Sequence, residues 1–303
     1  MSNELTRRQM IRGAGLALGG VVGAGVLQAC SGDAAAPPAT TADGGSGTGG
    51  QESSSGTLTT PKVSEFPYQK HLPAGYRLEA APVKETAYHG YYAGGCCHGA
   101  FSSLVGHLAT TAGAPFDQLP LDFGKFGSGG IAGYGSICGA VLGGVLVINM
   151  LTSNATARGA MMTDLMRWYE RTAFPQYVPT AIDAGETGLA LDFSGANLPR
   201  LQVQPGSHLC HASVSGWCAR NQVSAAGNDK KARCARLTAD VSGKVVEMVN
   251  AYLSGSAYTA AGIDALSGDC LGCHGGATPD RPVAAGMQCA PCHGGEAYSQ
   301  HPL

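Results

Sequence analysis

The sequence predicts a mainly α-helical protein, in which a helical body is followed by a short C-terminal segment of different composition. Apolar residues recur at helical spacing in long stretches of the body, whereas the polar–apolar alternation of a half-buried strand is scarce. From about residue 264 the chain is rich in Gly, Ala, Pro, Cys and His, and its few large apolar residues cannot form a core by themselves. We therefore assign residues 62–262 to the body and 263–303 to the segment.

Several stretches of the body carry recognisable patterns. Residues 83–112, 156–174 and 240–253 place apolar side chains along one helical stripe. Residues 137–148 are apolar on all sides and could form a buried strand, but their small residues favour a central helix that its neighbours approach closely. Residues 200–204 alternate between two flanking prolines, which limits them to a short edge strand.

Residues 1–30 form a targeting segment. Arg7 and Arg8 precede an apolar run over residues 14–27, which is the order of a signal peptide and resembles a twin-arginine export signal. The run is too short to favour a permanent membrane-spanning helix. It ends in Leu-Gln-Ala followed by Cys30, which resembles a lipoprotein processing box. We expect Cys30 to become the lipidated N-terminus; the alternative is an ordinary cleaved signal with an incidental cysteine.

Residues 31–61 consist mainly of Ala, Pro, Gly, Ser and Thr, so they cannot bury a core and should form a disordered, flexible linker. The expected product is an exported lipoprotein, periplasmic or on the cell surface, that its lipid anchor holds at a membrane. The net charge is −2 and neither sign of charge dominates. Nothing in this balance indicates binding to nucleic acid.

Two Cys-x-x-Cys-His motifs lie in the C-terminal segment, formed by Cys270, Cys273 and His274 and by Cys289, Cys292 and His293. This is the attachment signature of haem c, in which two thiols bind one porphyrin as thioethers and the histidine is the proximal iron ligand. The alternative is a single Cys₄ zinc site. Because a histidine follows each cysteine pair and an exported protein meets the haem-attachment machinery, we predict two haem c groups.

The two motifs are close in the sequence. Residues 275–288 separate them, and Pro279 and Pro282 exclude a helix there. Two haems tied so closely should lie in or near van der Waals contact, which serves fast electron exchange. The fold class is then a helical body with a short di-haem segment that its cofactors organise.

Six cysteines remain in the body: Cys96, Cys97, Cys138, Cys210, Cys218 and Cys234. An even number in an exported protein is consistent with three disulfides. An iron–sulfur cluster is the other hypothesis, since adjacent cysteines pair awkwardly and thiolates in a glycine-rich pocket are suitable ligands. The twin-arginine route also carries folded proteins that already hold a cofactor, whereas haem c is attached only after export. We favour the cluster over the disulfides, with Cys138, Cys218 and Cys234 as ligands together with Cys210 or one of the Cys96 and Cys97 pair.

Four cysteine-containing blocks of the body form a recognisable series, over residues 94–101, 138–143, 210–218 and 234–240. Together with the paired haem motifs, they resemble the redox-active Cys-Gly-Cys-Ala family and, more narrowly, the split-Soret cytochromes c, from about residue 88 to the end. The resemblance implies a homodimer, haems stacked at one end, bis-histidine iron and an iron–sulfur centre. The double cysteine departs from the family pattern, so the equivalent of its ligand is either Cys96 or Cys97.

The distal ligands of the two haem irons are sought among the other histidines. The loop between the motifs has none, and His301 lies near a chain end that is costly to order. At least one ligand should therefore come from the body of this subunit or of a second one. We favour His98 and His211, which lie in the cysteine-rich blocks, with His208 and then His89 as competitors. The alternative is that water completes the iron.

The sequence thus predicts an exported di-haem c-type cytochrome that carries electrons to a redox partner protein it does not identify, with an iron–sulfur cluster as a further candidate cofactor. One alternative is a redox enzyme in which one haem keeps an open sixth site and acts on a small molecule. Another is a structural lipoprotein whose haems only hold the tail folded.

Overall fold

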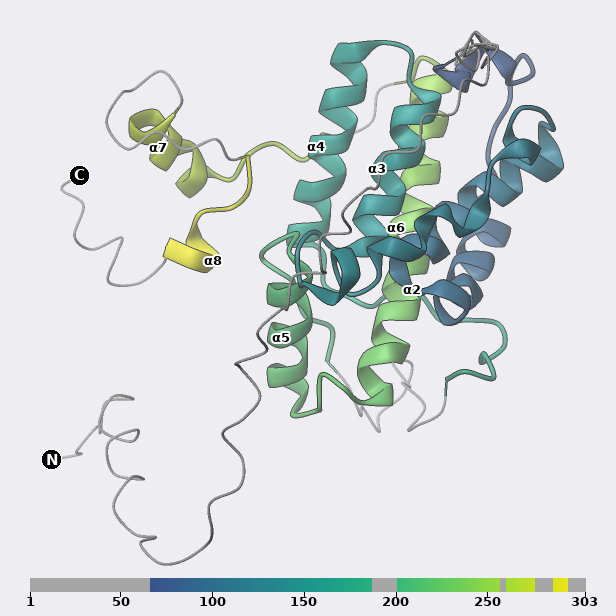
Figure 1. The fold of residues 1–303 in the computed structure, drawn as a ribbon. Helices are drawn as coiled ribbons and strands as arrows, with labels where there is room; N and C mark the ends of the chain where they lie inside the picture. The colour runs from purple at the N-terminus through teal and green to yellow at the C-terminus, as the bar shows by residue number, and fades with distance from the viewer. Residues whose placement is uncertain (1–65, 187–200, 257–259, 276–285, 294–303) are drawn as a thin grey trace, which may run out of the picture. The chain divides into compact units, whose positions relative to one another are not determined.

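The computed structural model describes residues 66–186, 201–256, 260–275 and 286–293 (Figure 1). The predicted signal peptide with Cys30, the predicted linker, His301 and most of the loop between the haem motifs lie outside these ranges. Within them the chain is mainly helical, as predicted, and no strand forms. None of the described helices is both long and apolar enough to cross a lipid bilayer.

The body contains five α-helices in its described residues: α2 (Ala80–Thr111), α3 (Gly139–Leu151), α4 (Ala155–Arg171), α5 (Cys210–Asn221) and α6 (Asn228–Leu253). Short 3₁₀ turns precede or connect them: η1 (Tyr68–His71), η2 (Phe116–Gln118), η3 (Leu121–Gly127) and η4 (Ile131–Gly133). The C-terminal segment contains α7 (Ala265–His274) and α8 (Ala290–His293).

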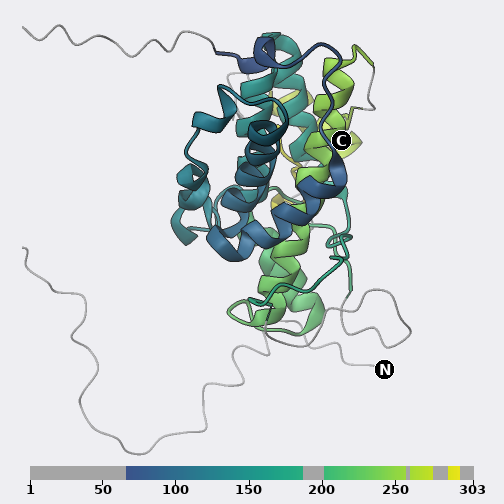
Figure 2. The same ribbon diagram turned by 90° about the vertical axis from the view of Figure 1, so that its right-hand side faces the viewer.

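The core of the body lies where α2, α3 and α6 pack against one another, with α4 beside α3 (Figures 1 and 2). Small residues of α3 permit this close packing. A Cβ atom on Gly143 would lie 2.7 Å from the carbonyl oxygen of Cys97, and one on Gly144 would lie 2.8 Å from Val245 Cγ2. The apolar run is therefore the central helix predicted from its small residues, and not a strand.

Helix α2 is broken at Gly95, where φ is +85°. This left-handed conformation favours glycine, and a Cβ there would lie 2.5 Å from Ser128 Oγ. The break comes immediately before Cys96 and Cys97, both of which are buried. It thereby sets the direction in which the double cysteine enters the core.

Two elements differ from their predicted form. Helix α6 begins at Asn228, although its apolar stripe predicts residues 240–253 alone. Its earlier turns bury Arg233 and Arg236, and a pattern built on apolar positions treats such residues as exposed. The predicted edge strand near residues 200–204 is reduced to one antiparallel bridge between Val203 and Phe174.

Candidate functional site

Separate elements bring the six body cysteines into the interior. Cys96 and Cys97 follow the break in α2, and Cys138 immediately precedes α3. Helix α5 carries Cys210 and Cys218, and helix α6 carries Cys234. All six are buried free thiols. Residues distant in the sequence thus supply a set of sulfur ligands inside the body.

Four of these thiols form an inner set, which we define as Cys96, Cys138, Cys210 and Cys234. The Cys96 and Cys234 thiols share a hydrogen bond, which raises the pKa of Cys96 and lowers the pKa of Cys234 to about 5. Burial raises the pKa of Cys138 and Cys210, and the negative field of Cys234 raises both further. The inner set therefore interacts mutually, and its member from the double cysteine is Cys96.

Cys97 and Cys218 border this inner set. Burial, and then the field of Cys138, raises the pKa of Cys97 to about 12. Burial raises the pKa of Cys218 as well, with a smaller contribution from Cys234. In the described ranges, no three His, Cys, Asp or Glu side chains are arranged to bind a single metal ion. The inner thiols therefore do not form a mononuclear metal site as they stand.

A glycine-rich turn closes over the cysteines. A Cβ atom on Gly127 would lie 2.8 Å from Cys97 Sγ, and one on Gly139 would lie 2.1 Å from the carbonyl oxygen of Gly127. Backbone therefore approaches the double cysteine as closely as sterics allow. Replacing either glycine by a larger residue would force this turn away from the thiols.

A fully buried arginine lies against the inner set. Arg233 is 1% exposed; its Nη1 lies 3.8 Å from Cys234 Sγ, and its Nη2 donates to Ser213 Oγ at 2.7 Å. The Ser213 hydroxyl also hydrogen-bonds the Tyr169 hydroxyl at 2.7 Å, and Tyr169 in turn bonds Cys138. One network thus joins the guanidinium to two of the inner thiols.

The charge of Arg233 constrains the charge of the thiols. Burial alone would lower the pKa of Arg233, but the field of Cys234, followed by those of Tyr169 and Cys138, raises it instead. The more distant Asp240 accepts a hydrogen bond from the backbone N–H of Gln176, and burial raises its pKa to about 7. Since a buried cation without a counter-charge is strongly destabilising, the thiols are the natural carriers of negative charge here.

The C-terminal motifs have a different setting. In the first, Cys270, Cys273 and His274 lie on one face of α7, which Asp264 caps by accepting from the Ser267 N–H at 2.9 Å. Ser267 is the one residue of α7 that is buried. The helix therefore presents its motif without an apolar core beneath it.

The second motif lies beside the first. The Cys289 N–H donates to Ser267 Oγ at 2.9 Å, and the Cys270 and Cys289 thiols are within hydrogen-bond reach. Burial, and then the field of Cys289, raises the pKa of Cys270. Cys273 and Cys292, the second cysteines of the two motifs, are exposed. The structure thus brings the two predicted attachment sites together.

The predicted distal histidines are placed differently. His98 is 7% exposed, and its Nδ1 lies 3.2 Å from the Leu121 carbonyl oxygen. His211 is exposed at the start of α5. His89 lies on α2 with its Nδ1 2.5 Å from Asp183 Oδ2. None of these three lines the cavity beside the second haem motif.

That cavity, of about 320 Å³, instead contains His208. It is lined by Thr163, Met166, Arg167, Glu170, His208, Gly286 and Met287. His208 Nδ1 lies 3.0 Å from Oε1 of Glu170, which is 1% exposed, and Glu170 Oε2 has no hydrogen-bond partner in the described ranges. A carboxylate that orients an imidazole through one nitrogen is the usual outer partner of a metal-bound histidine.

Sequence reasoning ranked His208 below His98 and His211, and it did not identify Glu170 or Arg233. The order of the preferred histidines came from their proximity to cysteines in the chain, but Glu170 is brought to His208 by the packing of α4. No periodic pattern marks a buried arginine. Its position directly before Cys234 was the one available signal, and it is a weak one.

Two cofactor types fit the residues present. The C-terminal motifs offer free thiols and a histidine at attachment spacing, in a segment without apolar packing of its own, which suits haem. The inner set offers buried thiols facing a buried cation, which suits an anionic iron–thiolate group. Cysteines that share a cluster are held apart by the cluster itself, so they need not meet at one ion.

Comparisons with known proteins agree with a chain that combines these C-terminal motifs with a set of buried cysteines. Residues 96–248 match the model of the family described as "Putative redox-active protein (C_GCAxxG_C_C)". The chain is 34% identical over 231 residues to split-Soret cytochrome c of Desulfovibrio desulfuricans, covering 75% of this chain and 79% of that protein. A solved structure of split-Soret cytochrome c from that organism, described as having a novel iron centre, matches with a TM-score of 0.61 and 31% identity, over 75% of this chain and 92% of the other. The chain therefore belongs to the redox-active C_GCAxxG_C_C family and is a cytochrome-like relative of split-Soret cytochrome c.

Proposed function

We propose that this protein is a di-haem c-type electron carrier whose body also holds an iron–thiolate centre. The observation that carries the proposal is the pairing of the two attachment motifs, whose first cysteines, Cys270 and Cys289, lie side by side. One Cys₄ zinc site would need all four motif cysteines to converge, but no metal-binding group of three or more residues forms in the described ranges. Two neighbouring haems need only this proximity.

The residues of each motif would hold one haem. Cys270 and Cys273 would bind the first porphyrin and His274 its iron, and Cys289, Cys292 and His293 would do the same for the second. A bound haem supplies reversible one-electron chemistry at iron. The protein contributes the ligands. The haem would fill the space beside a segment that has few buried residues of its own.

His208 is our structural candidate for a distal ligand. The cavity that it lines includes Met287, two residues before the second motif, and a Cβ atom on Gly206 would lie 3.3 Å from Pro291 Cγ inside that motif. Glu170 fixes the imidazole through Nδ1 and leaves Nε2 for a metal. Filling this sixth position favours electron transfer over an enzyme with an open haem.

His211 and His98 remain candidates for the other haem, in this subunit or across a dimer. Exposed apolar side chains lie close to both histidines. The 3₁₀ turn η3 contacts His98, and Gly135, next to Tyr134 in the chain, lies against His211. These side chains include Phe123, Phe126, Ile131 and Tyr134. A homodimer that covers them would bury apolar surface, and sedimentation of the purified protein tests for it.

The inner thiols favour an iron–sulfur cluster over three disulfides. Disulfides are neutral and would leave Arg233 buried without counter-charge, whereas an anionic iron–thiolate group would neutralise it. Such a group supplies a further one-electron centre. Cys96, Cys138, Cys210 and Cys234 would hold it, with Cys97 and Cys218 at its border.

Intact mass and metal analysis test these assignments together. Under denaturing conditions the protein should carry the mass of two haems, and anaerobic preparations should contain non-haem iron and acid-labile sulfide. A mass without haem would refute the carrier. Finding neither iron nor sulfide, with the six body cysteines mapped as disulfides, would refute the cluster.

We also propose that the protein is exported and held at a membrane through lipid on Cys30. Support comes from the arginine pair, the apolar run and the composition of residues 31–61. A multiply acylated cysteine anchors stably. The Cys30→Ala variant should leave the membrane fraction and enter the aqueous phase in detergent partitioning; unchanged partitioning would refute the anchor.

A further inference from the structure

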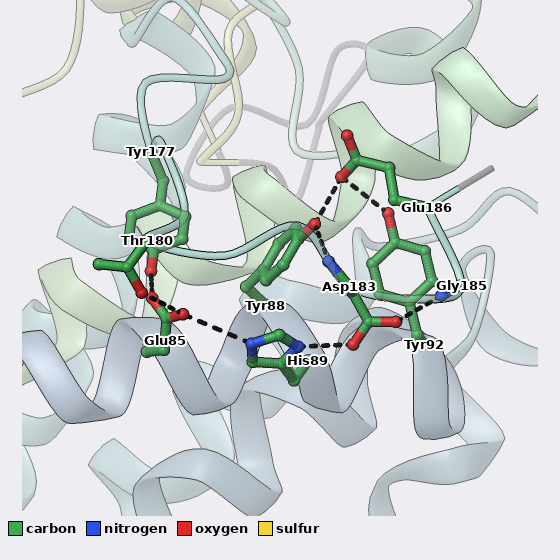
Figure 3. A network of polar contacts seen from close by, with 9 residues as sticks. All are labelled: Glu85, Tyr88, His89, Tyr92, Tyr177, Thr180, Asp183, Gly185 and Glu186. Carbon is green, nitrogen blue, oxygen red and sulfur yellow. Dashed lines mark hydrogen bonds and ion pairs between the residues drawn. The ribbon is translucent and has the colours of Figure 1, made fainter. Parts of the chain in front are cut away.

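A polar network over α2 shows how this body pairs its buried charges. The Glu186 carboxylate accepts from the Tyr88 hydroxyl at 2.6 Å and from the Tyr92 hydroxyl at 3.2 Å through one oxygen (Figure 3). Its other oxygen accepts from Arg236 at 2.9 Å, and both side chains of this ion pair are buried. Such pairing is expected, because a buried donor or acceptor without a partner destabilises the fold.

One face of α4 departs from this rule. Its buried atoms Arg167 Nε, Glu170 Oε2, Arg171 Nε and Arg171 Nη2 have no hydrogen-bond partner in the described ranges. Glu170 nevertheless bonds His208 through its other oxygen, and Arg171 Nη2 lies 3.9 Å from Asp264 Oδ2. The Arg167 side chain differs, because within the same ranges it makes neither an ion pair nor a hydrogen bond. Among the described residues of this face, Arg167 is therefore the cation without a partner.

Arg167 lines the cavity of about 320 Å³ that also contains His208. Thr163, one helical turn earlier on α4, lines it as well, so a hydroxyl accompanies the guanidinium. Met287 supplies apolar lining from the side of the C-terminal segment. Glu170 is the acidic side chain of this lining, and it bonds His208 without forming an ion pair with Arg167. The cavity can therefore hold an anionic group on an apolar stem.

A guanidinium recognises a carboxylate because its N–H donors match the two carboxylate oxygens in direction. The position of the cavity indicates where such a carboxylate comes from. Met287 precedes Cys289 of the second motif by two residues, and a Cβ atom on Gly206, two residues before His208, would lie 3.3 Å from Pro291 Cγ within that motif. A haem carries two propionate chains at one edge, each ending in a carboxylate. A haem held by this motif would therefore bring carboxylates to the side of α4.

We infer that Arg167 and Thr163 form a carboxylate site on α4, and that a propionate chain of the haem at the second motif occupies it. Arg167 would neutralise the carboxylate, and the Thr163 hydroxyl would donate to one of its oxygens. The haem would then be held at two places, by its covalent motif in the C-terminal segment and by α4 of the body. This assignment rests on the proposed haem at Cys289 and Cys292.

The test uses the full-length, haem-loaded protein and two readouts. Resonance Raman spectroscopy records the bending vibration of the propionate chains, which shifts when their hydrogen bonds change, and potentiometric titration gives the reduction potential of each haem. Arg167→Gln should shift the propionate band and lower the potential of one haem, because loss of a nearby cation stabilises the oxidised form. Arg167→Lys keeps the charge and should preserve most of the potential.

Matched variants separate a propionate contact from general packing. Arg158→Gln alters another arginine of α4, which donates to the Thr152 carbonyl oxygen, and should leave both readouts unchanged. Thr163→Val removes the hydroxyl at nearly constant shape and should shift the band more than the potential. A free carboxylate from solution is the other source, so sodium propionate is added at constant ionic strength and should change neither readout. A change that depends on Arg167 would show that the site is open to free acid, and it would overturn the haem as its occupant.

Removal of each haem in turn identifies the one involved. The effect of Arg167→Gln should persist in Cys270→Ser/Cys273→Ser, which lacks the first motif, and vanish in Cys289→Ser/Cys292→Ser. Persistence in the latter, or a folded Arg167→Gln protein with two haems and unchanged readouts, would overturn the site alone. An intact mass without haem would overturn the proposed carrier and this site with it.

Discussion

Replacing Arg233 is the sharpest test of the charge carried by the inner thiols. The guanidinium is 1% exposed and its Nη1 lies 3.8 Å from Cys234 Sγ. At an effective dielectric constant of about 20, a unit charge at that distance stabilises a thiolate by about 4 kcal/mol. Because an added electron increases the negative charge at the centre, Arg233→Met should lower its reduction potential.

The size of this shift has an upper bound. At about 2.3 kcal/mol per 100 mV, the full Coulomb energy corresponds to roughly 170 mV for one electron. Delocalisation of the electron over a cluster reduces that figure. Arg233→Lys is the matched control, since it keeps the charge on a shorter donor and should shift the potential less. Potentiometric titration of the body centre, followed by electron paramagnetic resonance, measures both variants.

The free energy of unfolding of the Arg233→Met variant provides the result that would refute an anionic centre. If the thiols are anionic, Arg233→Met leaves them without their counter-ion and lowers the free energy of unfolding. If they are paired in neutral disulfides, the same substitution removes an uncompensated buried cation and should stabilise the protein. A stabilised Arg233→Met variant with an unshifted potential would therefore reject the anionic centre.

Three other predictions follow from the described contacts. Replacing both Cys270 and Cys273 by Ser should remove one of two covalent haems, and an unchanged intact mass would contradict the assignment. His208→Ala should convert one haem to a high-spin spectrum, whereas His211→Ala tests the other candidate, and a low-spin spectrum in the His208 variant would exclude that ligand. Asp240, which is 7% exposed, has its pKa raised to about 7 from an ordinary 3.8, so the folded state holds the proton more tightly. Stability present below about pH 4 should therefore be lost as the pH rises through 7, by at most about 4 kcal/mol, and urea unfolding should show this loss in the wild type but not in Asp240→Asn.

The sequence allowed prediction where chemistry or packing leaves a local pattern. The two Cys-x-x-Cys-His motifs can be recognised from six residues at fixed spacing, and their assignment to haem stays a prediction. The small residues of the run before Ile148 correctly indicated a central helix. The cysteine-rich blocks and their family resemblance were also visible without coordinates. In each case the relevant residues are neighbours in the chain or repeat with the period of the structure.

What escaped prediction depends on contacts between distant segments. Arg233 is buried on α6, where it contacts Cys234 and also Ser213 of α5, and its own position shows no apolar signal. His208, which lies just before α5, pairs with Glu170 of α4, which is 38 positions away in the chain. The choice of Cys96 over Cys97 for the inner set depends on the break at Gly95. None of these follows from propensity or spacing alone.

The two cofactor sites differ in what folds around them, and this difference supports a two-step assembly. The inner thiols lie in a body whose core is already built from α2, α3 and α6, so a cluster can be inserted into a domain that packs largely through other residues. In α7 and α8 one residue, Ser267, is buried, so the segment would need the proposed haems to supply a core. A cluster loaded before twin-arginine export and haems attached afterwards would match this division. Under the same reasoning, loss of haem should unfold the C-terminal segment and leave the helical body intact.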